Sequence, residues 1–428
     1  MYSSRHLPAR YWTRVFAAAL GILLGAVMGG NAFAWNNEKV LHSFSGSLDG
    51  MLPVAELITD SAGNLFGTAS QGGASNWGTV FKISPDGAFT LMYSFTGGSD
   101  GGNPGGTLYI DKGGNLFGTT MSGGKEGCGE FGQGCGVVFK LSPSGTYSVL
   151  YTFSGGKDGD LPAGGLLADN EGNLYGTTQL GGASGSGCGG FGCGVVFKLS
   201  QGGSLTVLHS FLGSDGAFPS SGVTMCHNGN LCGTTRKGGT GCRLDISGCG
   251  TVFELSPKGN LKVLYSFSGS DGFLPNALYR DSKGVLYGTT LAGGPRCSLN
   301  TLGCGVVFDL SPEKSFTIRH AFKDREGAAP YGGLIADNEG NLYGTTNAGG
   351  DQGCTGLYGC GTVFRLSPGW EYTILHSFAG SPTEGGAPGA GLIADGKGNL
   401  YGTTMVGGTA DDGTIFSLTV MNPWRKVY

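Results

Sequence analysis

The sequence predicts an all-β fold, a seven-bladed β-propeller with four-stranded antiparallel blades. Three observations predict it: a phrase that recurs along the chain, a very high glycine content, and an isolated strand near the N-terminal end. The phrase is clearest at residues 340–346, where it reads Gly-Asn-Leu-Tyr-Gly-Thr-Thr. Its seven versions are spaced 51 to 58 residues apart, a period typical of repeat folds. They begin at Gly63, Gly114, Gly172, Gly229, Gly284, Gly340 and Gly398.

Glycine makes up 88 of the 428 residues, without the Gly-X-Y period of collagen. Such richness also occurs in disordered chains. Disorder is rejected here because 39% of the residues are hydrophobic, and they occur in short alternating runs between the glycines. The glycines are therefore expected to mark turns between many strands.

Residues 330–378 are a representative repeat, and the first half of this repeat predicts a hairpin. Residues 333–337 form a short apolar run bounded by turn residues, which is typical of a buried strand. Residues 338–341, Asn-Glu-Gly-Asn, predict a tight turn, because Asn favours turn positions and Gly accepts a positive φ. Residues 342–346 are rich in β-forming residues and are expected to pair back as the second strand.

The second half of the repeat predicts two more strands. A glycine-rich loop carrying Cys354 and Cys360 follows the first hairpin. Residues 362–367 form the third predicted strand, and residues 372–378 form the fourth after a Pro-Gly turn. Four short antiparallel strands in about 50 residues are typical of a propeller blade. A solenoid is the main alternative, but it would need atypical capping repeats at both ends, and neither end shows one.

The two ends of the repeat region predict how the ring closes. Residues 40–44, Val-Leu-His-Ser-Phe, copy the fourth strand but have no preceding three. The last repeat supplies the first three strands, the third at residues 414–420, and has no fourth. We therefore expect the N-terminal strand to complete the last blade, which would remove two exposed sheet edges.

Residues 1–34 are interpreted as a signal peptide, and residues 35–428 as a single propeller domain. Arg5, Arg10 and Arg14 form a basic leader, residues 15–28 are apolar, and Ala-Phe-Ala precedes the predicted cleavage site. An uncleaved membrane anchor is the alternative, although the apolar run is short for a span. The expected location is secreted or periplasmic.

Charge excludes two classes of partner. Without its leader the chain has 23 basic and 30 acidic residues, a net charge of −7, and no cluster of Lys and Arg. This balance argues against binding to nucleic acid or to an anionic membrane surface. We expect a monomer that leaves the membrane after signal cleavage.

Ten of the twelve cysteines fall into local pairs, which in an exported protein indicate disulfides. A metal site is the alternative, but the spacing within the pairs varies and no histidine accompanies them. Cys226 and Cys232 flank a hairpin turn, where a bridge is also expected. The local pairs are Cys128/Cys135, Cys188/Cys193, Cys242/Cys249, Cys297/Cys304 and Cys354/Cys360.

Strand order predicts which end of the ring varies. Antiparallel strands alternate in direction, so the cysteine loops and the links between blades share one end, and the two tight turns share the other. Loops on a rigid scaffold often carry function, so this loop-rich rim is the predicted binding face. Its candidate aromatic residues are Trp77, Phe131, Phe191 and Tyr358. They could stack on sugar rings or fill gaps between loops.

An acidic residue followed by glycine begins each link between blades. Seven such carboxylates near a central opening could bind calcium, a hard cation that takes oxygen ligands. The alternative is that each Asp-Gly only forms a turn, with the carboxylate accepting backbone N–H groups. No cofactor is otherwise expected. The residues are Asp49, Asp100, Asp158, Asp215, Asp271, Glu326 and Glu384.

Four histidines occupy one position of the fourth strand, where other repeats carry tyrosine, and this alternation indicates a structural role. They are His42, His209, His320 and His376. The common signatures of serine hydrolases, zinc proteases and phosphate-binding loops are absent from the sequence. No catalytic residue is therefore predicted.

The composite repeat, from Gly-Asn-Leu-Tyr-Gly-Thr-Thr through Gly-Thr-Val-Phe-Lys-Leu-Ser-Pro to Val-Leu-Tyr-Ser-Phe, resembles the GloVer tandem repeat of bacterial "choice-of-anchor" proteins. The resemblance covers residues 40–420. It implies an exported bacterial repeat protein and carries over no catalytic residue. Members often end in an anchoring segment, whereas residues 421–428 contain no such motif, which favours release or periplasmic residence.

The leading functional hypothesis is an exported, non-catalytic scaffold that binds a glycan or a protein through its loop-rich rim. The seven repeats are alike, whereas catalysis usually requires a few positions to break the symmetry. Two alternatives stay open. One is a polysaccharide-active enzyme, a hydrolase or lyase using carboxylates of the links, and the other is a structural envelope protein.

Overall fold

A computed structural model describes residues 38–420 except 130–131, 184, 186–187, 227–228, 243–246, 298, 300–301 and 351–358. The described residues all belong to one compact unit, Ala34–Tyr428. The predicted signal peptide lies outside the described residues. Within the described ranges, no helix has the length and apolar character needed to cross a membrane.

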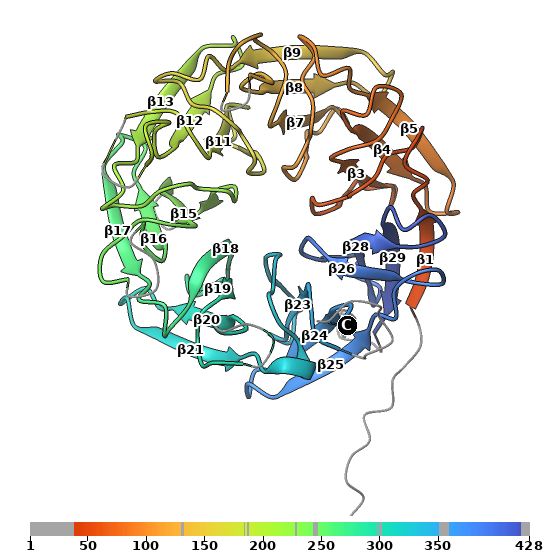
Figure 1. The fold of residues 1–428 in the computed structure, drawn as a ribbon, viewed down its shortest axis with the longest axis vertical. Coiled ribbons are helices and arrows are strands. Elements are labelled where there is room, and N and C mark those ends of the chain that lie inside the picture. Colours follow the sequence, from red (N-terminus) through yellow and green to blue (C-terminus); the bar gives the residue numbers. More distant parts are fainter. Residues whose placement is uncertain are drawn as a thin grey trace, which may run out of the picture. The chain divides into compact units, whose positions relative to one another are not determined.

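Seven antiparallel sheets are arranged in a ring around a central axis (Figure 1). We number the blades one to seven from the sheet that begins with β2, so that β1 belongs to blade seven. The innermost strands are β2 (Ile58–Thr59), β6 (Tyr109–Ile110), β10 (Leu167–Ala168), β14 (Thr224–Met225), β18 (Phe273–Arg280), β22 (Ile335–Ala336), and β26 (Gly385–Pro388) with β27 (Ile393–Ala394). The second strands are β3 (Leu65–Ala69), β7 (Leu116–Thr120), β11 (Leu174–Thr178), β15 (Leu231–Thr235), β19 (Leu286–Ala292), β23 (Leu342–Thr346) and β28 (Asn399–Gly407).

The two remaining strands of each blade lie farther from the axis. The third strands are β4 (Thr79–Ile83), β8 (Val137–Leu141), β12 (Val195–Leu199), β16 (Thr251–Leu255), β20 (Val306–Leu310), β24 (Thr362–Leu366) and β29 (Thr414–Thr419). The outer strands are β5 (Phe89–Ser94), β9 (Tyr147–Thr152), β13 (Leu205–Ser210), β17 (Leu261–Ser266), β21 (Phe316–Ala321), β25 (Tyr372–Ser377) and β1 (Glu38–Ser43). A short 3-10 helix, η2 (Asp324–Glu326), follows β21.

The N-terminal strand closes the ring, as predicted. β1 pairs antiparallel with β29 of blade seven, with Glu38 opposite Leu418 and Ser43 opposite Thr414. Figure 1 shows β1, in red, beside the blue C-terminal strands. The first and last parts of the repeat region therefore share one sheet.

The innermost strands differ from the prediction. Residues 333–337 were expected to form a strand, but β22 contains only Ile335 and Ala336. The preceding residues turn toward the axis instead of pairing with β23. The second, third and fourth strands of this repeat match the prediction to within one residue.

The hydrophobic core lies between neighbouring blades. A phenylalanine just after each outer strand packs edge-on against a phenylalanine of the third strand in the next blade, with ring centroids 5.0 to 5.4 Å apart. Such pairs contribute about 0.5–1.5 kcal/mol beyond their buried area. The pairs are Phe44–Phe81, Phe95–Phe139, Phe153–Phe197, Phe211–Phe253, Phe267–Phe308, Phe322–Phe364 and Phe378–Phe416.

The glycine within the recurring phrase is explained by this packing. A Cβ atom added at Gly344 would lie 2.6 Å from the Phe364 ring and 2.8 Å from a methyl carbon of Leu334. Any larger residue would force the buried ring away, which costs stability. The recurring phrase is thus the buried second strand, and its similarity among the blades is a requirement of packing.

Five disulfides are present among the described residues, and each matches a predicted pair. Cys360 is also disulfide-bonded, while its predicted partner Cys354 lies outside the described residues. Such bonds are typical of proteins from oxidising compartments. The five are Cys128–Cys135, Cys188–Cys193, Cys226–Cys232 in the hairpin of blade four, Cys242–Cys249 and Cys297–Cys304.

The second cysteine of several loop pairs is a core residue. Cys135, Cys193 and Cys249 are each 0% exposed, although their loops belong to the predicted rim. Each of the three stands two residues before a third strand, where its side chain joins the hydrophobic core between blades. They are therefore core residues that offer no surface to a ligand, and each disulfide ties the end of a loop to the core.

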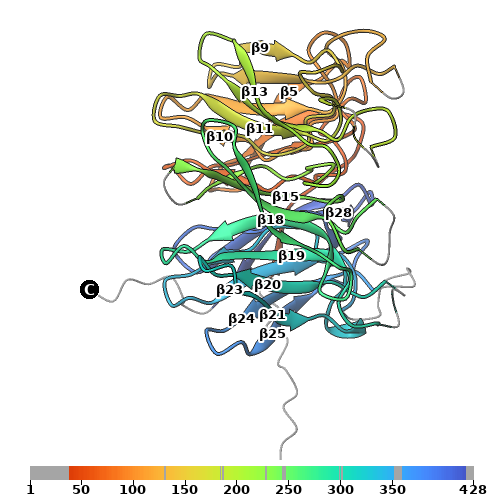
Figure 2. The same cartoon turned by 90° about the vertical axis from the view of Figure 1, so that its left-hand side faces the viewer.

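The long connections gather at one end of the ring. Each second strand leads into a third strand at the same end where the links between blades run, and the tight turns lie at the opposite end. Figure 2 shows the ring from the side, with the long connections on the right. We call this end the loop-rich face.

Candidate functional site

A pocket of about 340 Å³ lies on the axis of the ring. Its wall consists mainly of short segments that follow a proline, and all but one precede the innermost strand that pairs with the second strand. In blade five the segment lies within β18. We call all of them the channel segments. They are residues 54–56, 105–107, 163–165, 220–222, 276–277, 331–333 and 389–391.

Four further lining residues show where the pocket opens. Ser70, Met121, Gln179 and Arg236 line the pocket, and each directly follows a second strand. Second strands run toward the loop-rich face, so these residues lie at that end. The pocket is therefore at the loop-rich end of the central channel.

The recurring phrase holds the channel segments in place. In every blade except blade one, its first threonine donates a hydrogen bond from Oγ1 to a backbone carbonyl in the channel segment of the next blade. Thr345 donates to Ala390 O at 2.7 Å, and Thr177 donates to Ser221 O at 2.9 Å. These buried bonds satisfy carbonyl groups that no strand pairing satisfies. The phrase thus supports the site as well as the core.

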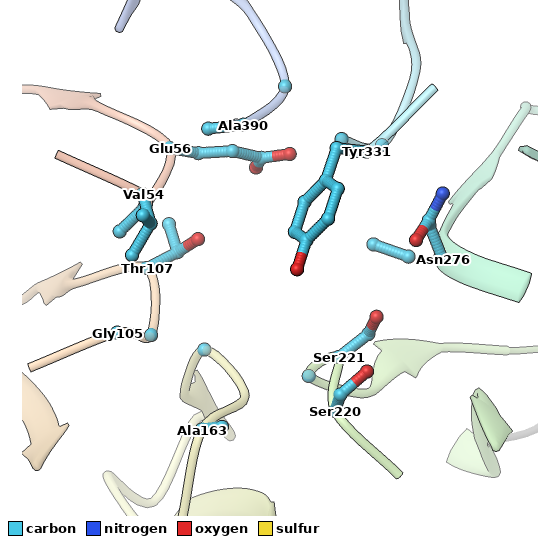
Figure 3. A pocket seen from close by; sticks show the side chains of 18 of the residues that line it. Val54, Glu56, Gly105, Thr107, Ala163, Ser220, Ser221, Asn276, Tyr331 and Ala390 are labelled. Atoms are coloured by element: carbon cyan, nitrogen blue, oxygen red, sulfur yellow. The ribbon is translucent and has the colours of Figure 1, made fainter. Parts of the chain in front are cut away.

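Glu56 is a carboxylate of the central pocket, and its side chain lies beside Ala390 (Figure 3). It belongs to blade one, and it accepts backbone N–H groups of Gly333 in blade six and Gly391 in blade seven. A Cβ atom at Gly333 would lie 3.2 Å from Oε1 of Glu56, so glycine leaves the room that the carboxylate needs. Burial raises the pKa of Glu56 despite the two hydrogen bonds.

Tyr331 faces the same pocket. The residue is 38% exposed, and its hydroxyl points into the open space opposite Ser220 and Ser221 (Figure 3). The guanidinium of Arg236 lies 5.6 Å from the centre of the ring. Asn276, itself buried, donates its amide to Pro330 O at 2.7 Å and so fixes the backbone just before Tyr331.

The predicted acidic residues lie elsewhere, beside the outer strands. Asp100 accepts a hydrogen bond of 3.0 Å from the Tyr93 hydroxyl and one of 2.9 Å from Thr96 N. Asp49 pairs in the same way with His42 Nε2 at 3.0 Å. Burial, and then the hydrogen bond to Asp100, raise the pKa of Tyr93 to about 12.

Three other carboxylates repeat these hydrogen bonds, Asp158 with Tyr151, Asp215 with His209 and Asp271 with Tyr265. The last two lie beside a histidine without a hydrogen bond, Glu326 at 3.2 Å from His320 and Glu384 at 3.4 Å from His376. Each serves the turn of its own blade, and none lines the central pocket. The turn role weighed in the sequence analysis therefore describes their contacts. Calcium binding stays a prediction.

The predicted rim aromatics have different surroundings. The Trp77 ring packs on the backbone of the following link, where a Cβ atom at Gly102 would lie 2.6 Å from the indole. Phe191 is 50% exposed on the loop-rich face. Phe131 and Tyr358 lie outside the described residues.

Sequence reasoning missed the channel segments because they resemble ordinary turns. One signal could have found them. Aligned on the preceding proline, the third position is Glu56 in blade one and Thr107 in blade two, but glycine in four other blades. The first position is Tyr331 in blade six and a small or amide residue elsewhere, apart from Val54. These are the symmetry-breaking positions of the ring.

A comparison with protein families matches the Gloeobacter/Verrucomicrobia repeat at residues 29–243, 129–302 and 188–416. The chain belongs to this family. The resemblance of the composite repeat to it is therefore confirmed. No curated protein sequence matches this family member significantly.

Several solved structures match this family member at low identity. The extracellular domain of the putative one-component system BT4673 from B. thetaiotaomicron has a TM-score of 0.53 and 12% identity, covering 89% of this chain. This chain spans 41% of that protein's chain. A putative gluconolactonase has a TM-score of 0.41 and 12% identity over 91% of this chain and 94% of its own. A putative 6-phosphogluconolactonase from Bacteroides uniformis has 0.47 and 14% over 75% and 83%.

Proposed function

We propose that this protein is an exported, non-catalytic binding propeller that holds the terminal sugar of a glycan in the pocket at the loop-rich end of its channel. The observation that carries the proposal is the convergence of Glu56, Tyr331 and Arg236 on one pocket. These residues come from three blades and break the symmetry of the ring. The proposed site thus lies at the centre of the loop-rich face, whereas the sequence predicted a binding face along the whole rim.

The chemistry of the pocket suits a sugar. Its volume of about 340 Å³ lies at the small end of the range for ligand sites. The exposed Tyr331 ring offers an apolar face for sugar C–H groups and a hydroxyl for hydrogen bonding. Glu56 supplies a held acceptor, and Ser220 and Ser221 add hydroxyl groups.

Binding is favoured over glycoside hydrolysis by the carboxylates. Hydrolysis of a glycosidic bond usually requires a pair of carboxyl groups on either side of the bond. Among the residues that line the described pocket, Glu56 supplies the one carboxyl side chain. A polysaccharide hydrolase or lyase and a structural envelope protein are the other candidates, and the experiment below separates them.

Three observations support export. The disulfides are numerous, the leader has the features of a signal peptide, and the BT4673 structure is an extracellular domain. The finer location, secreted or periplasmic, is part of the proposal. The monomeric state is also proposed.

The proposal is tested on a glycan array and a polysaccharide panel with purified protein. We expect binding without release of product, and Tyr331→Ala should weaken it at least about tenfold, the equivalent of one lost contact of about 1.4 kcal/mol. The matched control is Phe191→Ala, which removes an exposed aromatic of the same face. Its binding should stay within about twofold of the unmodified protein.

Three results would contradict the proposal. Turnover of any glycan would favour the enzyme. A loss of binding in Phe191→Ala alone would move the site from the channel to the rim. Absence of any glycan bound would favour the structural protein. Equal melting temperatures of the two variants and the unmodified protein show that the fold is kept.

A further inference from the structure

One position, the first residue of each outer strand, recurs at every junction between blades. It is apolar at six junctions and charged at the junction that closes the ring. In six junctions the histidine or tyrosine of an outer strand faces the first residue of the next outer strand, which is aromatic or leucine. Phe89 lies opposite Ile83 in its sheet, and Glu38 lies opposite the equivalent Leu418. Glu38 therefore takes the apolar position at the seventh junction. The six residues at this position are Phe89, Tyr147, Leu205, Leu261, Phe316 and Tyr372.

In the other junctions the apolar residue covers the ring of its neighbour. His42 stacks on Phe89 with centroids 3.9 Å apart, and His320 stacks on Tyr372 at 4.2 Å. A carboxylate cannot stack in this way. At the junction that closes the ring, the charged Glu38 therefore occupies the position of the apolar residue.

Three metal-ligating side chains meet as a result. Oxygen atoms of Glu38 in β1 and Glu384 after β25, and a ring nitrogen of His376 in β25, all lie within 4.8 Å of one another. His376 is 5% exposed, and its Nε2 has no hydrogen-bond partner. Oε1 of Glu38 is also buried without a partner.

The distances within this cluster differ from those of the hydrogen-bonded pairs. His42 and His209 lie 3.0 and 2.9 Å from the acids beside them. Nε2 of His376 and Oε2 of Glu384 are 3.4 Å apart. Two ligands of a tetrahedral zinc ion, each about 2.0–2.2 Å from the metal, are separated by roughly 3.3–3.6 Å.

The charges of the cluster also call for a cation. Glu38 and Glu384 place two carboxyl groups beside the buried ring of His376. Acidic groups gathered in this way are costly to bury unless a positive charge compensates them. Imidazole nitrogen with carboxylate oxygen is a ligand set that zinc and related divalent transition metals accept.

We propose that Glu38, His376 and Glu384 bind one divalent transition-metal ion of the zinc class across the junction that closes the ring. One ligand comes from the N-terminal strand, one from the outer strand of blade six and one from the link that follows this blade. The metal joins segments more than 330 residues apart in sequence and fastens β1 to its neighbour. This inference is independent of the proposed function.

The blade-five to blade-six region offers a matched control. His320 and Glu326 form the same kind of His–Glu pair, 3.2 Å apart without a hydrogen bond, but Tyr372 replaces the third ligand. Glu326→Gln should therefore leave metal binding unchanged. Glu38→Leu restores a residue that two other junctions carry and should abolish it.

The experiment uses untagged protein, stripped with a chelator and titrated with zinc chloride by calorimetry. We expect one zinc ion per chain and a rise in Tm of about 3 °C at zinc 100-fold above Kd. Glu38→Leu should lose both effects, and Glu326→Gln should keep them. Cobalt(II), added to the unmodified protein, should give a visible absorption band that equimolar zinc removes.

Three outcomes would overturn the proposal. They are binding of less than one zinc ion per chain by the unmodified protein, a response of this protein to calcium but not to zinc, and zinc binding by Glu38→Leu equal to that of the unmodified protein. His376→Tyr provides a second variant with a residue that three other blades carry at this position. Retention of the cobalt band in this variant would also count against the proposal.

Discussion

At one position of the outer strand, histidine and tyrosine replace each other around the ring. Histidine or tyrosine at this position contacts the acidic residue that begins the next link. His42 and Tyr93 both form this contact as hydrogen bonds of 3.0 Å. His320 lies 3.2 Å from Glu326, and no hydrogen bond joins them. The exchange between the two residue types indicates a structural role.

His320 should make the protein sensitive to mild acid. Burial, and then the charge of Lys323, lower the pKa of His320 from 6.5 to about 4. Because the folded pKa lies below the unfolded one, the contribution of neutral His320 is complete above pH 6.5 and is lost as pH falls toward 4. His320→Tyr removes this contribution and introduces the residue found at Tyr93, Tyr151 and Tyr265.

The measurement is Tm by circular dichroism from pH 7 to pH 4. Relative to His320→Tyr, the unmodified protein should lose about 2 °C more over this interval. The comparison between proteins cancels the titration of groups that both contain. Identical slopes for the two proteins would show that His320 is not buried in its neutral form.

At the scale of the element, the inner hairpin is held together by hydrogen bonds in blade six and by a disulfide in blade four. In blade six, Asp337 accepts the backbone N–H groups of Glu339 and Asn341 and the hydroxyl of Tyr343, each at 2.9 Å. In blade four, Cys226 and Cys232 occupy the positions of Asp337 and Tyr343 and form a disulfide. A covalent bond replaces the hydrogen bond between the two strands.

The two solutions should be interchangeable. Cys226→Ala with Cys232→Ala should lower stability by about 2 kcal/mol, the chain entropy of a small loop. Cys226→Asp with Cys232→Tyr should recover about half of this loss, because Asn230 already stands where Asn341 stands in blade six. Chemical denaturation of the three proteins measures the difference. A double alanine variant as stable as the Asp/Tyr variant would show that the pair adds nothing.

Strand positions were largely predictable because alternating apolar residues and turn signals are local. β23 was predicted at its observed bounds, and β24 and β25 within one residue. The innermost strand was predicted too long, since the apolar run at residues 333–337 has two uses. Ile335 and Ala336 pair with β23, whereas Gly333 lines the pocket.

At the scale of the whole molecule, stability depends on the closure of the ring. The apolar surface of each blade is covered by the next, and Phe44 after β1 packs on Phe81 of blade one. Without β1 this contact is lost, and the outer edge of β29 is exposed to solvent. An exposed edge strand also promotes association between chains.

Deletion of residues 35–46 should lower Tm sharply, by about 10 °C or more, because it removes a full strand and the Phe44 contact. The control is a synthetic peptide of residues 35–46 added in trans, which should restore part of the lost Tm by adding the strand back. Differential scanning fluorimetry measures both. An unchanged Tm in the deletion protein would contradict the role of β1 in closure.

The sequence by itself determined the repeat, the blade, the ring closure, the disulfide pairs and the family, because each depends on local patterns or on equivalent positions in repeats. Only the tertiary structure located the two proposed sites and showed that Cys135, Cys193 and Cys249 lie in the core. Glu56, Tyr331 and Arg236 meet because the ring brings blades one, four and six to one axis. Glu38 meets His376 because closure places the first strand beside blade six. Both sites combine residues that are far apart along the chain, and a local sequence pattern cannot predict such contacts.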